Sequence, residues 1–239
     1  MMAACSTCGT EPLTDARFCH GCGSPVGRAE AAAEFKQVTV LFADVVHSMD
    51  IAAAVGAERL REIMAQLVEH ATAVVQRYAG TVDKFTGDGI MAVFGAPVAL
   101  EDHALRACLA ALDLQVEAKQ LAIDVDHHDG VRLLLRVGLN SGEVIAGEIG
   151  SGAGAYTAIG EQVGMAQRME SAAPPGGVIL SDSTARLVDG VVVLGDAESV
   201  GIKGADHPVP ARRLLGVAEH RIDARRDTTL LVGNGSWRH

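Results

Sequence analysis

Two aspartates, each placed where an apolar strand meets a turn, constrain the fold of this chain more than any other feature. Asp44 ends the largely apolar run 38–43, which predicts a buried strand. Asp88 lies between Gly87 and Gly89, which allow the tight turn of a hairpin. Between these segments, apolar residues recur at helical spacing at Leu60, Ile63, Met64, Leu67, Val68, Ala71, Val74, Val75 and Tyr78. The order of strand, helix and hairpin predicts that the two carboxylates meet at one edge of a sheet.

Two carboxylates placed in this way repel each other unless one is protonated or a cation lies between them. Ligation by oxygen alone favours Mg²⁺ or Mn²⁺, which bind one or two protein carboxylates together with substrate phosphates. Asp44 and Asp88 therefore predict a metal site of the kind used in two-metal phosphoryl or nucleotidyl transfer. For each residue taken alone, a surface carboxylate beside a turn is the simpler alternative.

Length and composition suit one globular domain with a small attachment. The chain has 239 residues, 49% of them apolar, and a net charge of −10. This negative charge argues against nucleic acid as a partner. No apolar run reaches the length of a membrane span, and the first residues lack the pattern of a signal peptide. We therefore expect a cytoplasmic protein without membrane contact, whose cysteines are reduced.

The N-terminal segment contains two C-x₂-C pairs, Cys5 with Cys8 and Cys19 with Cys22, and a glycine follows each pair. Together the pairs can supply four thiolates to one tetrahedral Zn²⁺, while a redox-active pair is the alternative. A site with four protein ligands has no open position for catalysis. A segment this short would take most of its folding energy from the metal. We predict one structural zinc ion in a small zinc ribbon.

The middle of the chain predicts further helices and strands. A second amphipathic helix follows Pro97 and places Cys108 on its apolar face, where a small buried hydrophobic residue is expected. The stretch 124–130 is expected as a solvated loop, with a second metal site as the alternative. Segments 131–142 and 143–150 are expected as paired strands, and the glycine-rich stretch 150–154 as a hairpin loop.

The C-terminal half completes an α+β domain. A helix is expected over 160–173 and ends at two prolines, and strands are expected at 178–181, 191–195 and 210–215. The resulting order of elements predicts a ferredoxin-like core with additions. The chain has no G-x-x-x-x-G-K-[ST] pattern, which argues against a P-loop nucleotide site.

Four segments resemble the catalytic domains of class III adenylate/guanylate cyclases: VTVLFADVVHS, DKFTGDGIMAVFG, RVGLNSGEVIAGEIG and YTAIGEQVGMAQRMESAAPPGGVILS. The resemblance implies a ferredoxin-like cyclase domain at 36–216. Before it we expect a zinc ribbon at 1–26 and a linker at 27–35. After it we expect a tail at 217–239, either disordered or a truncated linker to a further domain. Within this tail, TTLLVG is similar to the start of the ATPase module in longer regulators that combine zinc ribbon, cyclase and ATPase.

The resemblance implies roles for single residues. Asp44 and Asp88 would each help to hold two Mg²⁺ or Mn²⁺ ions, with the carbonyl of Val45 as a further ligand. Lys84 matches the family's purine-selecting lysine, and Thr157 matches the residue that partners it. A lysine donor with a threonine acceptor fits the edge of adenine, so ATP is the expected substrate. A solvated strand lysine and an ordinary strand threonine are the simpler alternative.

The helix expected over 160–173 carries one match and one departure. Arg168 matches the arginine that neutralises charge at the α-phosphate in the transition state. Gly164, four residues earlier on the same face, stands where the family has an asparagine that orients the ribose. Glycine has no side chain to donate, so either Gln162 or Gln167 substitutes or turnover is low, since one such hydrogen bond is worth about 10²–10³ in rate.

Three functions remain open. The first is an adenylate cyclase that acts in intracellular signalling as a homodimer, with each site shared between two chains as the family implies. The second is a cyclase-like module that binds nucleotide and catalyses weakly or not at all, which Gly164 favours. The third is a zinc-ribbon adaptor that only dimerises, which would not need both Asp44 and Asp88. In any of them, the zinc ribbon or the tail offers contact to a protein partner or an attached regulatory domain.

Overall fold

A computed structural model describes residues 4–24, except 6, 12, 14, 15 and 17, together with residues 33–148, 156–202 and 207–218. Most of the expected linker, the glycine-rich stretch 150–154 and the tail beyond residue 218 lie outside the described residues. No helix in the described part of the chain has both the length and the hydropathy needed to cross a membrane.

Four strands form the centre of a mixed sheet. They are β1 (Glu34–Val45), β2 (Thr81–Phe85), β3 (Gly89–Phe94) and β4 (Leu135–Glu148), arranged in the order β2-β3-β1-β4 with antiparallel neighbours. With the helices between them, this is the ferredoxin-like arrangement that the sequence predicts. The α+β class is therefore confirmed.

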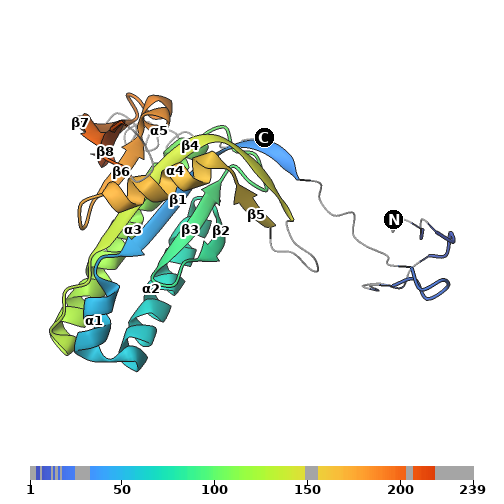
Figure 1. The fold of residues 1–239 in the computed structure, drawn as a ribbon, viewed down its shortest axis with the longest axis horizontal. Coiled ribbons are helices and arrows are strands. Elements are labelled where there is room, and N and C mark those ends of the chain that lie inside the picture. Colours follow the sequence, from blue (N-terminus) through green and yellow to red (C-terminus); the bar gives the residue numbers. More distant parts are fainter. Residues whose placement is uncertain are drawn as a thin grey trace, which may run out of the picture.

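Four further strands extend the sheet. β6 (Val178–Ser181), β8 (Val209–Val217) and β7 (Val192–Val200) continue it beyond β4, and β5 (Tyr156–Ile159) pairs with the C-terminal end of β4. Figure 1 shows that β4 arches over the sheet, so that β5 comes down beside β2 and β3. The prediction of two paired strands at 131–142 and 143–150 was wrong, because β4 runs through both segments without a turn.

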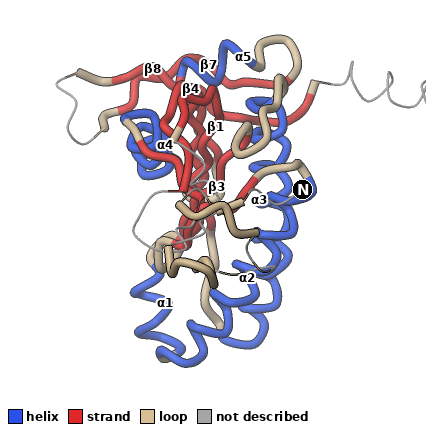
Figure 2. Tube along the Cα trace, turned by 90° about the vertical axis from the view of Figure 1, so that its right-hand side faces the viewer, coloured by secondary structure: helices blue, strands red, loops and turns tan. Residues whose placement is uncertain are grey.

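Helices cover both faces of the sheet (Figure 1). α1 (Ser48–Val55), α2 (Ala57–Arg77) and α3 (His103–Asp129) lie on one face, and α4 (Glu161–Ala172) lies on the other. Figure 2, turned by 90°, shows α3 and α4 on opposite sides of the strands. A short helix, α5 (Asp182–Leu187), follows β6. Helices that alternate with strands thus produce a sheet covered on both faces.

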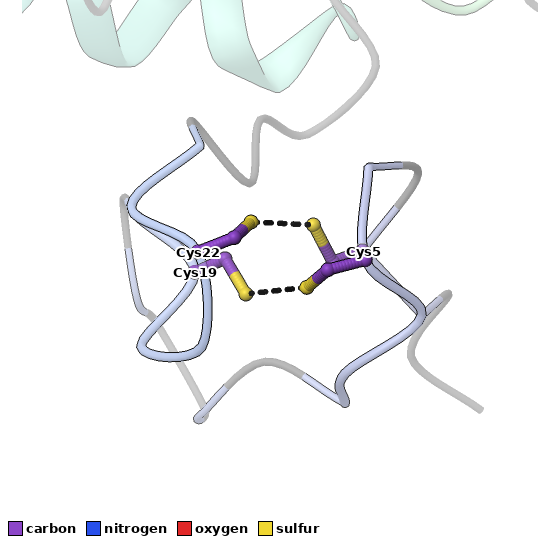
Figure 3. A group of neighbouring side chains, drawn as sticks. Cys5, Cys19 and Cys22 are labelled. Carbon is purple, nitrogen blue, oxygen red and sulfur yellow. Dashed lines mark hydrogen bonds between the residues drawn. The ribbon is translucent and has the colours of Figure 1, made fainter.

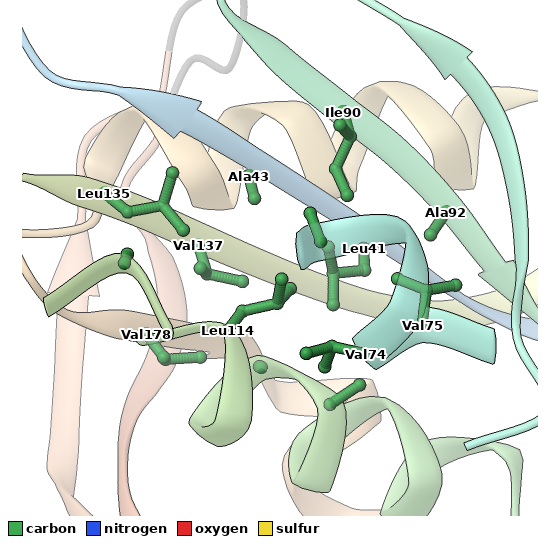
Figure 4. Packing of buried hydrophobic residues seen from close by; sticks show 14 of the residues in the cluster. Leu41, Ala43, Val74, Val75, Ile90, Ala92, Leu114, Leu135, Val137 and Val178 are labelled. Carbon is green, nitrogen blue, oxygen red and sulfur yellow. The ribbon is translucent and has the colours of Figure 1, made fainter. Parts of the chain in front are cut away.

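β1 is buried on both faces, as its apolar run predicts. Leu41 and Ala43 point toward α2 and α3, where they pack in the main core (Figure 4). Val40 and Phe42, one residue out of phase, pack with Ala166 of α4 on the other face. By the same alternation Asp44 belongs to the α4 face. β1 therefore carries its carboxylate to the less covered side of the sheet.

The end of α3 corrects another expectation. The stretch 124–130 is not a loop, because helix α3 continues to Asp129 and ends at Gly130 in the left-handed conformation, with φ of 68°. Asp129 accepts hydrogen bonds from the guanidinium of Arg59 at 2.9–3.1 Å, so it holds an ion pair instead of a metal. Cys108 is fully buried on this helix, as predicted, and burial raises the pKa of its thiol to about 12.

Candidate functional site

The strand register brings Asp44 beside the hairpin that carries Asp88. In the β1–β3 ladder Asp44 lies opposite Gly89, the residue after Asp88. A Cβ at Gly89 would lie 2.8 Å from Asp44 Oδ1 and would also meet the carbonyl of Ala43. Gly89 therefore lets the hairpin approach the end of β1 closely. The predicted meeting of the two aspartates at one sheet edge follows from this contact.

The turn before α1 completes this edge. Ser48, the first residue of α1, donates a hydrogen bond from its hydroxyl to Asp88 Oδ2 at 2.6 Å. The backbone N–H of Val45 donates to the carbonyl of Asp88 at 3.1 Å. His47, between them, adopts the left-handed conformation with φ of 55°, and its side chain is exposed. α1 begins here, and the start of a helix favours anions such as phosphate.

A second acidic group and one arginine adjoin Asp44. Arg136 lies opposite Asp44 in the β1–β4 ladder, and its Nη2 is 3.3 Å from Asp44 Oδ2. Arg136 Nε lies 3.0 Å from Oε1 of the buried Glu170 in α4, although these two atoms are not aligned for a hydrogen bond. Three carboxylates, those of Asp44, Asp88 and Glu170, thus surround one guanidinium. The excess negative charge makes the cluster suited to a cation.

The pKa values report the same crowding. Burial, followed by the neighbouring Asp88 and Glu170, raises the pKa of Asp44 to about 7. Burial acts to raise the pKa of Asp88 as well, but hydrogen bonds from Ser48 and Asp44 lower it below its usual value. Without a cation, Asp44 therefore loses its proton only around pH 7, well above the range usual for an aspartate. Two carboxylate oxygens and the nearby Val45 backbone are the oxygen donors that Mg²⁺ or Mn²⁺ require, so the residues present fit such ions.

On α4, Gly164 and Arg168 lie one turn apart on the less buried side of the helix. Arg168 has no ion-pair partner among the described residues, which leaves its charge available to a ligand or a second chain. A Cβ added at Gly164 would meet nothing within 4 Å. Gln162 faces the sheet, where Asn140 Nδ2 donates to its Oε1 at 2.9 Å, whereas Gln167 is exposed. Of the two proposed substitutes for asparagine, only Gln167 remains unengaged.

The structure places Lys84 and Thr157 on strands that meet. Lys84 lies on β2, is exposed, and has no ion-pair partner in the described part of the chain. Thr157 lies on β5, and its hydroxyl donates to Oδ2 of Asp83, the residue beside Lys84, at 2.9 Å. Asp83, which the sequence did not single out, therefore joins Thr157 to the segment of β2 that carries Lys84.

Sequence reasoning also missed Arg136, Glu170 and Ser48. A signal was present for Arg136, because it interrupts an otherwise apolar strand, and such a charge needs a partner. Glu170 gave no comparable signal, since its contact depends on how α4 packs on β4. At Gly138 of β4 a Cβ would collide with the backbone of Glu170, so glycine is needed for this close packing.

Comparison with known proteins identifies the domain. The family model described as the adenylate and guanylate cyclase catalytic domain matches residues 30–210. The chain belongs to the class III nucleotidyl cyclases. Soluble guanylate cyclase subunit beta-2 of Rattus norvegicus is 33% identical over 160 residues, which are 67% of this chain and 23% of the relative. The cyclase chain thus spans about a quarter of that relative's length.

Solved structures of class III cyclases share its fold. The guanylyl cyclase Cya2 superposes with a TM-score of 0.74 at 28% identity, covering 78% of this chain and 95% of Cya2. The adenylyl cyclase CyaB of P. aeruginosa gives a TM-score of 0.73 at 27% identity, covering 78% of this chain and 97% of CyaB. Cya2 is named as a guanylyl cyclase and CyaB as an adenylyl cyclase. These comparisons therefore do not decide whether this cyclase uses ATP or GTP.

Ahead of the cyclase domain, the four predicted cysteines form one cluster (Figure 3). Cys5 Sγ lies 3.7 Å from Cys22 Sγ, and Cys8 Sγ lies 3.5 Å from Cys19 Sγ. These distances are far too long for disulfides. They are close to the roughly 3.8 Å that separates thiolates on a tetrahedral Zn²⁺ with bonds of about 2.3 Å.

The two C-x₂-C pairs of the cysteine cluster have the same backbone conformation. Gly9 N–H donates to the carbonyl of Cys5 and Gly23 N–H to that of Cys19, both at 2.8 Å. Both glycines have φ of 72°, a left-handed conformation that favours glycine. Hydrogen bonding with Thr10 lowers the pKa of Cys8 to about 6, which favours the thiolate that a metal needs, whereas burial and the neighbouring Cys8 and Cys22 raise the pKa of Cys19 to about 11. The sulfur atoms and the paired turns fit one zinc ion.

We expect the purified protein to contain about one Zn²⁺ per chain, measured by elemental mass spectrometry. Cys5→Ser combined with Cys19→Ser removes one thiolate from each half, so its zinc content should fall to near zero. Cys108→Ala, a substitution of the buried cysteine outside the cluster, should keep full zinc. A double variant that still holds one zinc per chain would refute the site.

Proposed function

We propose that this chain is an adenylate cyclase, which converts ATP to 3′,5′-cyclic AMP and pyrophosphate in intracellular signalling. The observation that carries the proposal is the pairing of Asp44 and Asp88 at the end of β1, with more negative charge than Arg136 balances. β1, which is buried on both faces, holds Asp44 in place, and the turn between β2 and β3 holds Asp88 beside it. Such a fixed cluster costs stability unless a cation neutralises it, which supports a role in metal binding.

In the proposed reaction, the ribose 3′-oxygen bonds to the α-phosphorus, the bond from that phosphorus to the β-phosphate oxygen breaks, and pyrophosphate leaves. Two Mg²⁺ or Mn²⁺ ions, when bound, would promote loss of the 3′-hydroxyl proton and offset charge on the phosphates. Asp44, Asp88 and the carbonyl of Val45 would hold them. Arg168 would stabilise the negative charge at the α-phosphate, which its lack of an ion-pair partner among the described residues permits.

ATP is the proposed substrate because of Lys84 and Thr157. The ammonium of Lys84 can only donate, and it would meet N1 of adenine, which accepts. Thr157 would accept from the exocyclic amine of adenine. Guanine reverses both partners, since its N1 carries a proton and its 6-position is a carbonyl. The exposed position of Lys84 leaves it free to reach a base.

We also propose that the active unit is a homodimer, with Asp44 and Asp88 of one copy facing Lys84, Thr157 and Arg168 of the other. The resemblance to the family suggests this arrangement. It agrees with the position of Lys84 and Arg168, two cations without an ion-pair partner among the described residues, on a face of the sheet that α4 covers only in part. Two-fold symmetry then gives two equivalent sites per dimer.

A weakly active nucleotide-binding module is the second candidate, and Gly164 is the observation that favours it. The helix surface there is open, since a Cβ added at Gly164 would meet nothing within 4 Å, and glycine itself supplies no side chain in place of the family's asparagine. Gln167, one turn away and exposed, is the remaining substitute. The two candidates differ in rate and not in where the nucleotide binds.

The deciding experiment is incubation of the purified chain with Mg-ATP or Mn-ATP, followed by identification of the product by mass. We expect cyclic AMP and pyrophosphate in equal amounts and no product when the metal is chelated. Nucleotide that is bound but unchanged would support the regulatory module. ADP and phosphate as products would contradict both candidates.

A further inference from the structure

Asp83 lies at an irregularity in the pairing of β2 with β3. The β2–β3 ladder shifts register between Val82, opposite Ala92, and Lys84, opposite Met91. Asp83 is the extra residue of this bulge. Bulges redirect a side chain that would otherwise follow the strand's alternation. Here the redirected carboxylate reaches β5, which pairs with the C-terminal end of β4 and lies beside β2 (Figure 1).

A single oxygen of Asp83 makes both contacts with β5. Oδ2 accepts a hydrogen bond from the hydroxyl of Thr157 at 2.9 Å and another from the backbone N–H of Ala158 at 3.2 Å. Asp83 and Thr157 are half-buried, and Lys84 beside them is exposed. The carboxylate thus fixes both the position of β5 and the orientation of one hydroxyl group next to the lysine proposed to read the base.

An ionised carboxylate accepts hydrogen bonds and cannot donate them. A threonine hydroxyl has one proton, and in this contact that proton lies toward Asp83. What Thr157 then presents to a ligand is oxygen lone pairs, so it can accept but not donate. We propose that Asp83 sets the purine preference of this domain by forcing Thr157 to act as an acceptor, an inference that rests on the proposed nucleotide site.

The consequence is selectivity for adenine. The 6-amino group of adenine donates to an acceptor, whereas the 6-carbonyl of guanine would face the lone pairs of Thr157 and repel them. Without Asp83 the hydroxyl could rotate and donate to that carbonyl. Asp83 is therefore a positioning residue, which acts on the base through Thr157.

The test compares Asp83→Ala, Asp83→Asn and Thr157→Val. For each protein, ATP and GTP are compared by kcat/KM for cyclic nucleotide and by displacement of a fluorescent N-methylanthraniloyl nucleotide. Asp83→Ala should lower the ATP-to-GTP ratio about tenfold to a hundredfold, the size expected for one mismatched hydrogen bond in a partly buried site. Asp83→Asn keeps a carbonyl oxygen in the same place, so it should retain most of the preference. In the Thr157→Val background, Asp83→Ala should not change the ratio further.

Other outcomes separate the inference from the proposed function. If Asp83 only holds β5 in place, Asp83→Ala should lower the melting temperature and weaken the binding and use of ATP and GTP by the same factor. That result would overturn the inference. A wild-type protein that binds GTP at least as tightly as ATP also overturns it. A protein that prefers ATP in the displacement assay but forms no cyclic nucleotide contradicts the proposed activity. In that case the displacement ratios of the three variants still decide the role of Asp83.

Discussion

Asp44→Asn is expected to lower the rate of cyclic AMP formation by at least about 10³-fold, because it removes a charged ligand from the proposed metal site. Metal ions contribute several kcal/mol to such transition states, and about 1.4 kcal/mol corresponds to a factor of ten. The variant should still fold. It removes an ionisable carboxyl group from a cluster in which burial, followed by Asp88 and Glu170, already raises the pKa of Asp44 to about 7. Its melting temperature without metal should therefore match or exceed that of the wild type.

The control is Asp124→Asn, which makes the same change at an exposed position on α3. It should keep its activity within about twofold, as is usual for a remote surface substitution. Mn²⁺ should raise the melting temperature of wild type and Asp124→Asn, and should have little effect on Asp44→Asn. Full activity in Asp44→Asn, or an undiminished response to Mn²⁺, would mean that Asp44 does not bind the metal.

Gly164→Asn is expected to raise the turnover number, by up to about 10²-fold, by restoring a donor that would stabilise the transition state. The structure leaves room for it, because a Cβ at this position meets nothing within 4 Å. Steady-state kinetics with saturating Mn-ATP measures the change. The gain should be in kcat and not in KM, since the interaction is made in the transition state.

Gly164→Ala controls for the helix itself. Alanine should stabilise α4 by roughly 1 kcal/mol without supplying a donor, so its kcat should not change. If alanine and asparagine raise kcat equally, helix rigidity explains the effect and not a hydrogen bond. If Gln167→Ala lowers kcat in the wild type but not in Gly164→Asn, then Gln167 serves as the natural substitute. An unchanged kcat in Gly164→Asn would show that the missing asparagine does not limit this protein.

Local patterns were enough to predict the parts of the site that lie on β1 and the β2–β3 hairpin. An apolar run that ends in Asp44, and an aspartate between two glycines, specify a strand and a turn within a few residues. The ladder between β1 and β3 then follows from the fold class. The cluster of four cysteines could also be predicted from the sequence, because a C-x₂-C pair followed by glycine forms its turn within a few neighbouring residues.

Contacts between distant segments could not be predicted in the same way. Gly142 was expected to end the first of two paired strands, but in the structure it lies within β4 and makes room for the side chain of Gln162, whose Cδ would lie 2.9 Å from an added Cβ. The same holds for Glu170, which meets Arg136 only because α4 packs closely on β4 at Gly138. The roles of Gly142, Gly138 and Glu170 depend on how α4 packs on the sheet. The order of residues along the chain does not show this packing.

Complementation between two inactive variants tests whether a metal-dependent site is shared between two chains. Asp44→Ala and Arg168→Ala should each be nearly inactive alone, since either homodimer lacks a needed group at both sites. After mixing, with subunit exchange verified by native mass spectrometry, each heterodimer has one site that lacks both groups and one that is intact. We predict recovery of up to about half the wild-type rate per heterodimer. If a mixture that demonstrably contains heterodimers shows no recovery, each site is built within one chain. This result would contradict a site shared between two chains.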